Sequence, residues 1–271
     1  MLILLGGGQG QNSSGAASFG TTVVAAYSAL ISTAGGTLDS TSTSALITFV
    51  DTLNNAGIWV KLLEVWTSTG SNLAAALVKL KYPSAIQSSL TNNGFVSGDY
   101  TPTTGLQGGA SKFLGTGFIP ANQIASSVDF GFSLFIKNSV GNASNNINYF
   151  GCDTSNRVFS VFASTSLAAT IVANSYSVAS GIRTTCFVSA NNLSMLSGYL
   201  KRDTTQIATK SVVTPGTLPS TEAQVYTYNG GTITQNARGI IYFYSIHTGL
   251  TDAESTTLYN AITTLNTSLG R

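Results

Sequence analysis

The strongest constraint on the fold lies close to the C-terminal end of the chain. Residues 238–247 read RGIIYFYSIH and are apolar at successive positions, which predicts a strand that is buried on both faces. Thr251 and Glu254 then form a T-x-x-E capping box, in which each side chain accepts a hydrogen bond from the other residue's backbone N–H. Apolar residues follow at helical spacing: Leu258, Ile262 and Leu265. A buried strand therefore leads into a capped helix that lies against the sheet.

Between residues 72 and 250 the apolar residues recur at every second position, the period of a strand with one buried face. The clearest rows are Phe130, Phe132, Leu134, Ile136 and Val78, Leu80, Tyr82, the latter alternating with Lys79 and Lys81. Further strands are expected at 145–151, 157–163, 167–173, 182–189, 193–201, 206–212 and 223–229. Short strands separated by turn-rich segments predict an all-β fold, an antiparallel β-sandwich.

A helical element is expected ahead of the sandwich. Residues 42–56 carry apolar side chains at three- and four-residue spacing, with Ser42 or Ser44 as the N-cap and Gly57 after the last turn. Residues 58–66 continue at helical spacing and predict a second, short helix.

These patterns divide the chain into three parts. Residues 1–40 are rich in Gly, Ser, Ala and Thr and predict an extended arm that becomes ordered on assembly, although Val23–Tyr27 could form a strand or a helix. Residues 41–70 form the helical linker element, whose Trp59 and Trp66 anchor it to the sandwich, and residues 71–271 form the sandwich itself.

The composition of the chain argues against nucleic acid and membranes as partners. Charged residues make up 8% of the chain and the net charge is +2, so no electrostatic feature predicts binding to nucleic acid. No apolar stretch is long enough for a membrane-spanning helix, and Leu2–Leu5 is too short for a secretory signal. Cys152 and Cys186 lie in separate expected strands and are interpreted as core thiols, with a disulfide as the alternative.

Two resemblances rest on these residues. The segment Gly249–Glu254, followed by a helix with Leu258 and Tyr259, resembles the closing segment of concanavalin A-like, laminin G-like jelly rolls. Residues 196–203 resemble a hairpin of that family, although Arg202 and Asp203 occupy the turn without a glycine.

The second resemblance is to tailed-bacteriophage structural proteins. Residues 44–66, with Ala56-Gly57-Ile58-Trp59-Val60-Lys61, and the final Leu269-Gly270-Arg271 are similar to segments that flank a laminin G-like sandwich in those proteins. The resemblance implies a virion component, a capsid or tail decoration or a fibre.

Catalytic and metal sites find little support in the sequence. His247 is the only histidine and no G-x-S-x-G elbow accompanies it, so it is interpreted as a residue at an edge or rim of the sandwich. Gly6–Gly10 lacks the lysine and spacing of a phosphate-binding loop. Asp129 and Asp153 lie at expected strand ends without a recognisable glycosidase pattern.

The remaining candidates concern ligands. Calcium is a minor alternative, through Asp153, Asn156 or the run Asn142–Asn146. Tyr226 and Tyr228 share a strand face and could stack on a sugar, but packing inside the sandwich is the preferred interpretation. We therefore expect no catalytic residue, no bound metal and no cofactor, and the sequence assigns no ligand-binding residue.

The sequence thus predicts a non-enzymatic virion structural protein of a tailed phage, assembled in the host cytoplasm. Its N-terminal arm would attach it to other virion proteins and to sister subunits in a homo-oligomer, for which a trimer is one option. The alternative is a carbohydrate- or receptor-binding module for host adsorption, with host surface glycans as partners. A hydrolase of surface polysaccharide is the third hypothesis.

Overall fold

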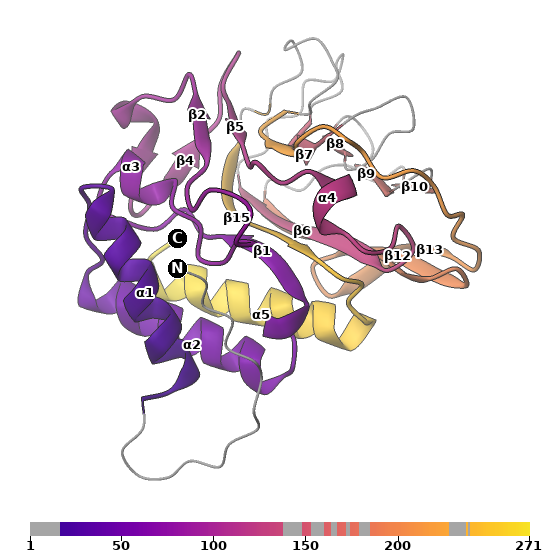
Figure 1. The fold of residues 1–271 in the computed structure, drawn as a ribbon, viewed down its shortest axis with the longest axis horizontal. Helices are drawn as coiled ribbons and strands as arrows, with labels where there is room; N and C mark the ends of the chain where they lie inside the picture. The colour runs from indigo at the N-terminus through magenta and orange to yellow at the C-terminus, as the bar shows by residue number, and fades with distance from the viewer. Residues whose placement is uncertain are drawn as a thin grey trace.

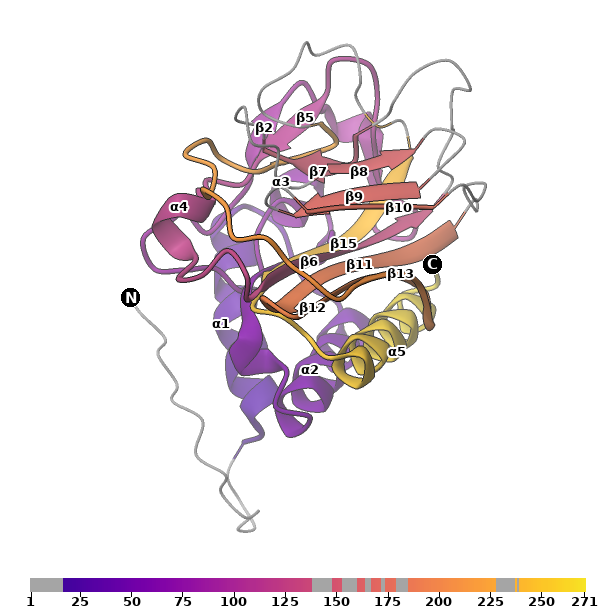
Figure 2. The same cartoon turned by 90° about the vertical axis from the view of Figure 1, so that its right-hand side faces the viewer.

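The computed structural model describes residues 17–137, 148–152, 160–163, 167–171, 174–178, 185–227, 237 and 239–271. Three layers are stacked: a layer of helices, a large central sheet and a second layer of two smaller sheets (Figures 1 and 2). All strand pairs in the three sheets are antiparallel. The predicted all-β antiparallel sandwich is confirmed.

The large sheet has eight strands in the order β13-β12-β11-β6-β15-β4-β3, with β1 also paired to β15. Its strands are β1 (Leu62–Trp66), β3 (Tyr100–Thr101), β4 (Gly105–Gln107), β6 (Phe130–Lys137), β11 (Thr185–Ser194), β12 (Ser197–Arg202), β13 (Thr205–Lys210) and β15 (Ile240–His247). The central strand β15 is buried at every residue, as its sequence predicts. It pairs with β6 on one side and with β1 and β4 on the other.

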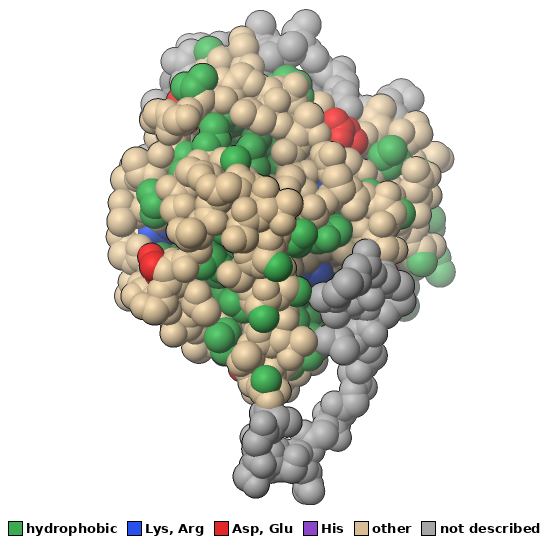
Figure 3. Space-filling model, turned by 60° about the vertical axis from the view of Figure 1, so that its left-hand side comes forward, with side chains coloured by type: hydrophobic (Ala, Val, Ile, Leu, Met, Phe, Trp, Pro, Cys, Tyr) green, Lys and Arg blue, Asp and Glu red, His purple; other side chains and the backbone are tan. Residues whose placement is uncertain are grey.

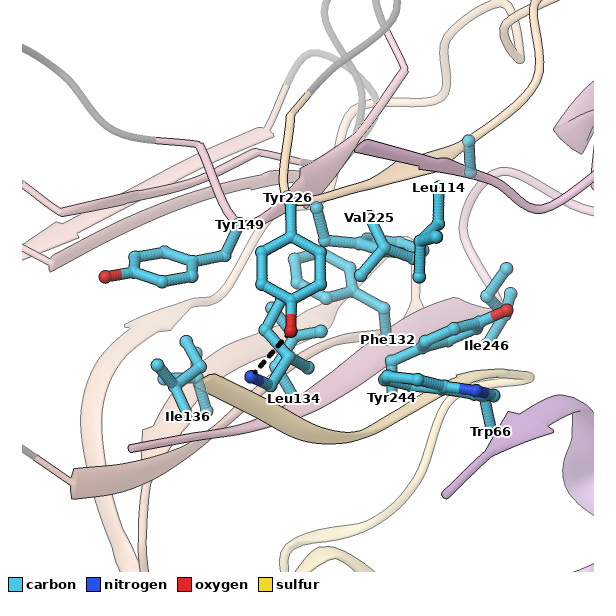
Figure 4. Close-up of a cluster of buried hydrophobic side chains, with 14 of the residues drawn as sticks. Trp66, Leu114, Phe132, Leu134, Ile136, Tyr149, Val225, Tyr226, Tyr244 and Ile246 are labelled. Carbon is cyan, nitrogen blue, oxygen red and sulfur yellow. Dashed lines mark hydrogen bonds between the residues drawn. The ribbon is translucent and has the colours of Figure 1, made fainter. Parts of the chain in front are cut away.

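Two smaller sheets face one side of the large sheet. One has the order β2-β5-β14-β7 and consists of Thr91–Asn93, Phe113–Gly115, Gln224–Val225 and Phe150–Gly151. The other has the order β10-β9-β8 and consists of Asn174–Val178, Leu167–Ile171 and Ser160–Ala163. The core between the layers is aromatic: Trp66 stacks on Tyr244 with ring centroids 5.7 Å apart, and Tyr226 points down from the small sheet (Figure 4).

Helices cover the other face of the large sheet. They are α1 (Phe19–Thr33), α2 (Ser40–Asn55) and α5 (Asp252–Ser268), while α3 (Leu73–Ala76), α4 (Pro120–Gln123) and the 3₁₀ turns η1 (Trp59–Lys61) and η2 (Ser97–Asp99) connect strands. A second core forms where Phe49 of α2 and Leu258 of α5 meet Phe187 and Phe243 of the sheet. The capping box of Thr251 and Glu254 is confirmed.

Several expectations for the N-terminal part are wrong. Within the predicted extended arm, residues 19–33 form α1, because Val24, Tyr27 and Ile31 lie at helical spacing and are all buried. The predicted helix over 58–66 is a 3₁₀ turn followed by β1, which is buried on both faces and therefore lacks a strand-like alternation.

Within the linker element over 41–70, residues 62–66 join the large sheet, since β1 pairs with β15. The helix over 42–56 is present as α2, but its N-cap is Asp39, whose Oδ1 accepts a hydrogen bond from Ser42 N at 2.6 Å. Gly57 adopts the expected left-handed conformation after that helix, with φ of 69°.

The strand predicted over 78–82 is reduced to two isolated bridges, through Val78 and Lys81. The hairpin over 196–203 is present as the end of β12 and its turn. Asp203 has φ of 53° there and accepts a hydrogen bond from Phe187 N at 2.9 Å, so aspartate replaces the expected glycine.

Candidate functional site

The cavity best suited to a ligand is a groove between α2 and α5. It has a volume of about 600 Å³, which lies within the usual range for small-ligand sites. The two helices run antiparallel, because Lys61, just after α2, pairs at 2.7 Å with Glu254 in the first turn of α5. Small residues on the facing sides of the helices leave the space between them. The lining consists of Ser40, Thr41, Ser44, Ala45, Thr48, Phe49, Thr52, Thr257, Asn260, Ala261, Thr264, Leu265 and Ser268.

Hydroxyl groups dominate this groove, and no charged side chain lines it. Thr48, Thr52 and Thr257 donate to carbonyls of their own helices and can only accept further hydrogen bonds. The six other polar side chains make no hydrogen bond within the described part of the chain: Ser40, Thr41, Ser44, Asn260, Thr264 and Ser268. The groove can therefore offer donors and acceptors to an uncharged, hydrogen-bonding ligand.

Carboxylates do not contribute to the groove. Each of the nine that the structure describes accepts a hydrogen bond within the fold. Five bind a backbone N–H: Asp39, Asp51, Asp129, Asp203 and Glu222. Four pair with a lysine: Glu64, Asp99, Asp252 and Glu254. These carboxylates hold loops and helix ends in place. The surface shows few charged side chains in the view of Figure 3.

His247 lies inside the molecule and not at a rim, so that expectation is wrong. Its Nε2 is 3.0 Å from Ser133 Oγ, and its Nδ1 is 2.9 Å from the carbonyl oxygen of Thr248. Since a carbonyl only accepts, Nδ1 carries the proton, which leaves Nε2 unprotonated beside Ser133 Oγ. Burial lowers the pKa of His247 to about 4, so the ring is neutral near neutral pH.

A row of small polar groups surrounds this histidine beneath α5. Ser133 and Ser189 share a hydrogen bond of 2.9 Å, and Asn191 Nδ2 donates to Ser189 Oγ at 2.8 Å. Asn191 Oδ1 accepts from Leu250 N at 2.9 Å, which ties the row to the connection between β15 and α5. The serine, histidine and asparagine of this row are fully buried, and the histidine contacts no carboxylate, so the row lacks the geometry of a catalytic triad.

The aromatic candidates are buried as well. Tyr226 is fully buried, and its hydroxyl accepts a hydrogen bond from Ile241 N at 3.0 Å (Figure 4). Trp59 and Trp66 are buried in the two cores. Tyr228 lies outside the described residues. None of the three described rings is available for stacking on a ligand.

The metal-binding and cysteine candidates from the sequence do not form a site among the described residues. Asp153, Asn156 and the run 142–146 lie outside the described residues, and the part of the chain that is described contains no cluster of metal-ligating side chains. Cys152 and Cys186 are both buried in the core between the sheets, and no disulfide joins them. Among the described helices none is both long and apolar enough to span a membrane.

The groove had no signal in the sequence. Its polar residues are exposed serines and threonines at ordinary helix positions, and the two helices lie some two hundred residues apart in the chain, roughly the whole length of the sandwich. Only the packing of α2 against α5 creates the space.

Comparison with known proteins identifies the fold. No family model and no curated protein matches the chain. A structure of botulinum neurotoxin type C, a toxin that enters cells in dependence on two ganglioside molecules, is similar with a TM-score of 0.54 and 16% identity, over 77% of this chain and 53% of the toxin chain. A Trypanosoma rangeli sialidase is similar with a TM-score of 0.53 and 11% identity, over 76% and 33%.

The binding domain of botulinum neurotoxin serotype D is a third similar structure, with a TM-score of 0.50, 12% identity and coverage of 74% and 51%. The chain thus spans about half of the toxin chains and a third of the sialidase chain. The prediction that this protein is not an enzyme is contradicted by the comparison, because sialidases are among the proteins that share its fold. The chain is a lectin-like, antiparallel jelly-roll sandwich.

Proposed function

We propose that this chain is a carbohydrate-binding module displayed on the particle of a tailed phage, where it contacts glycans of the host surface. The observation that carries the proposal is the sandwich that it shares with a ganglioside-dependent toxin. A lectin-like fold in a protein with few charged side chains suits ligands that are recognised by hydrogen bonds and not by charge.

The groove between α2 and α5 is the proposed binding site. Its hydroxyl and amide groups match the alternating donors and acceptors of a sugar ring, and six of them are free of hydrogen bonds within the described chain. Phe49 and Leu265 at its base supply apolar area for the carbon face of a sugar. The groove is open along two helices, which suits a chain of sugars better than a single enclosed one.

The virion setting rests on the sequence resemblance. Residues 44–66 and the ending Leu269–Arg271 are similar to segments of tailed-phage structural proteins. The low content of charged residues is compatible with a subunit of a larger assembly. Other virion proteins and sister subunits are the proposed partners. Mass spectrometry of purified particles that encode this chain tests the setting: its presence at a defined copy number supports it, and its absence removes it.

A glycan array tests the carbohydrate proposal. Thr264→Arg places a long side chain in the groove, and Thr267→Arg places the same side chain at an exposed position of the same helix outside the groove lining. We expect wild type and Thr267→Arg to bind a restricted set of glycans and Thr264→Arg to lose at least tenfold in affinity. Equal binding by both variants would place the site elsewhere, and no binding by wild type would refute the proposal.

Enzymatic activity is measured on the same ligands. Sialylated and neutral glycans are incubated with the wild-type chain, and released monosaccharide is quantified by chromatography. Release would assign a glycosidase activity to this sandwich, whereas binding without release would support recognition alone.

A further inference from the structure

Lys79 and Glu64 form an ion pair that is entirely closed to water. Lys79 Nζ lies 3.2 Å from Glu64 Oε2, and both side chains have an exposed fraction of 0%. Glu64 belongs to β1, while Lys79 lies in the segment that turns back along β1. An amine and a carboxyl group are therefore held in contact inside the core.

The surroundings of this pair favour its uncharged form. Burial raises the pKa of Glu64 and lowers the pKa of Lys79, against the attraction between the two charges. Glu222, which is partly exposed, raises the pKa of both groups: it opposes ionisation of Glu64, and it opposes deprotonation of Lys79 less than burial favours it. A proton shared toward the carboxyl group leaves a neutral amine, which is a nucleophile, beside a carboxylic acid, which is an electrophile.

Two further groups hold the pair in a reactive arrangement. The Tyr244 hydroxyl donates to Glu64 Oε1, the oxygen that does not face the lysine. Lys79 Nζ also donates to the carbonyl oxygen of Thr116, which fixes the direction of the amine. Tyr244 is itself held by Trp66, which stacks on its ring (Figure 4). The amine, the carboxyl group and a hydrogen-bond donor are therefore preorganised by the fold.

We propose that Lys79 and Glu64 condense to an amide, a covalent cross-link between Nζ and Cδ that forms in the folded chain. The nitrogen lone pair attacks Cδ of the protonated carboxyl group, and Tyr244 stabilises the charge that develops on Oε1. The bond from Cδ to Oε2 then breaks, and Oε2 leaves as water with its own proton and one proton from the amine. Oε1 becomes the amide carbonyl, and the remaining N–H continues to donate to Thr116.

Proximity of the two groups and the exclusion of water both favour the condensation. Groups held in contact react as if at effective concentrations of about 10⁵ M or more. Condensation releases a water from a closed core, and it replaces two buried ionisable groups, whose charged forms cost several kcal/mol each to desolvate, by a neutral amide. No oxidant, metal or second protein is required.

The other lysine–carboxylate pairs of the described chain provide internal controls. Lys201 is fully buried and lies 2.7 Å from Asp252 Oδ1, but the side chain of Asp252 is 53% exposed. Lys112 and Asp99 are 2.6 Å apart with exposed fractions of 25% and 16%. Water reaches these carboxylates, so contact alone does not satisfy the conditions met by Lys79 and Glu64.

The intact mass of the purified, full-length chain under denaturing conditions tests the cross-link. We expect a mass about 18 Da below that of the sequence, the loss of one water. Peptide mapping should recover residues 64 and 79 in one branched fragment. Lys79→Arg keeps the positive charge but removes the amine and should show the full mass of its sequence. Lys201→Arg should keep the deficit.

A wild-type chain with the full mass of its sequence would overturn the proposal, as would a deficit that persists in Lys79→Arg. If Lys79→Arg does not fold, the branched fragment from wild type decides the question alone. The result is independent of glycan binding, because the pair lies in the core and not in the groove between α2 and α5.

Discussion

His247 makes the stability of this fold depend on pH in a way that can be calculated. Its pKa is lowered from 6.5 to about 4 because the ring is buried, so the folded state holds the neutral form while the unfolded chain binds a proton more readily. The contribution of the neutral ring is complete above about pH 6.5 and is lost progressively as the pH falls toward 4. The lowering of the pKa from 6.5 to about 4 corresponds to about 3 kcal/mol, of which about 2 kcal/mol is lost by pH 5.

The perturbation is the substitution His247→Gln, which keeps a polar side chain but removes the titration. Urea denaturation of wild type and variant at several pH values between about 7.5 and 4 gives the free energy of unfolding for each. The nine described carboxylates are common to both proteins, so the difference between the two curves isolates the histidine. Lys61 and Glu254, which face the histidine with opposite charges, are also common to both.

We expect the wild type to lose about 2 kcal/mol more than His247→Gln between about pH 7 and pH 5. A constant difference across this range would refute the argument that the buried ring stays neutral. An NMR titration of the single histidine provides the second readout, since its ring should remain neutral down to about pH 5 while the chain is folded.

Three further changes test the helix layer and its attachment. Thr251→Ala removes the N-cap of α5 and should lower the free energy of unfolding by about 1 kcal/mol in urea; an unchanged midpoint would mean that the Lys61–Glu254 pair replaces the cap. Arg271→Ala removes the donors to the Ser68 and Pro102 carbonyls and should lower the free energy of unfolding by about 1–3 kcal/mol in urea. An unchanged free energy of unfolding would contradict this prediction. Deletion of residues 2–38 removes α1 and should cost about 5 kcal/mol or more, since three buried side chains are lost; a calorimetric Tm equal to wild type would contradict this.

The sequence predicts those elements whose signals are local. The strand over 238–247 and the capped helix after it follow from neighbouring residues, and both are present as β15 and α5. The row from Phe130 to Ile136 is likewise present as β6, because one of its faces packs against the smaller sheets. These elements are specified by periodicity that does not depend on distant partners.

The elements that were missed depend on distant partners. β1 is a strand because β15 lies beside it, and its burial on both faces hides the alternation that would identify it. Lys79 alternates with apolar residues and therefore suggests an outward position, yet it is fully buried because Glu64 compensates its charge. Helix α1 did have a local signal in Val24, Tyr27 and Ile31, but the surrounding small polar residues predicted an arm.

The candidate site could not be predicted from the sequence for the same reason. A groove between two helices is a property of their packing, and neither its volume nor its uncommitted hydroxyl groups can be read from either helix alone. The aromatic residues that did suggest a sugar site are needed in the core, where Tyr226 supports the backbone of β15 through Ile241.

The pairing of β1 with β15 also sets the order of events while the chain is being synthesised. Glu64 and its partner Tyr244 are 180 residues apart. At synthesis rates of about 5–20 residues per second, β1 and α2 wait roughly 10–35 s before the strand that covers them leaves the ribosome. During that interval Phe49 and Trp66 lack their ring partners Phe243 and Tyr244. The large sheet can therefore be completed only after β15 has emerged, because β15 joins β6 to β1 and β4.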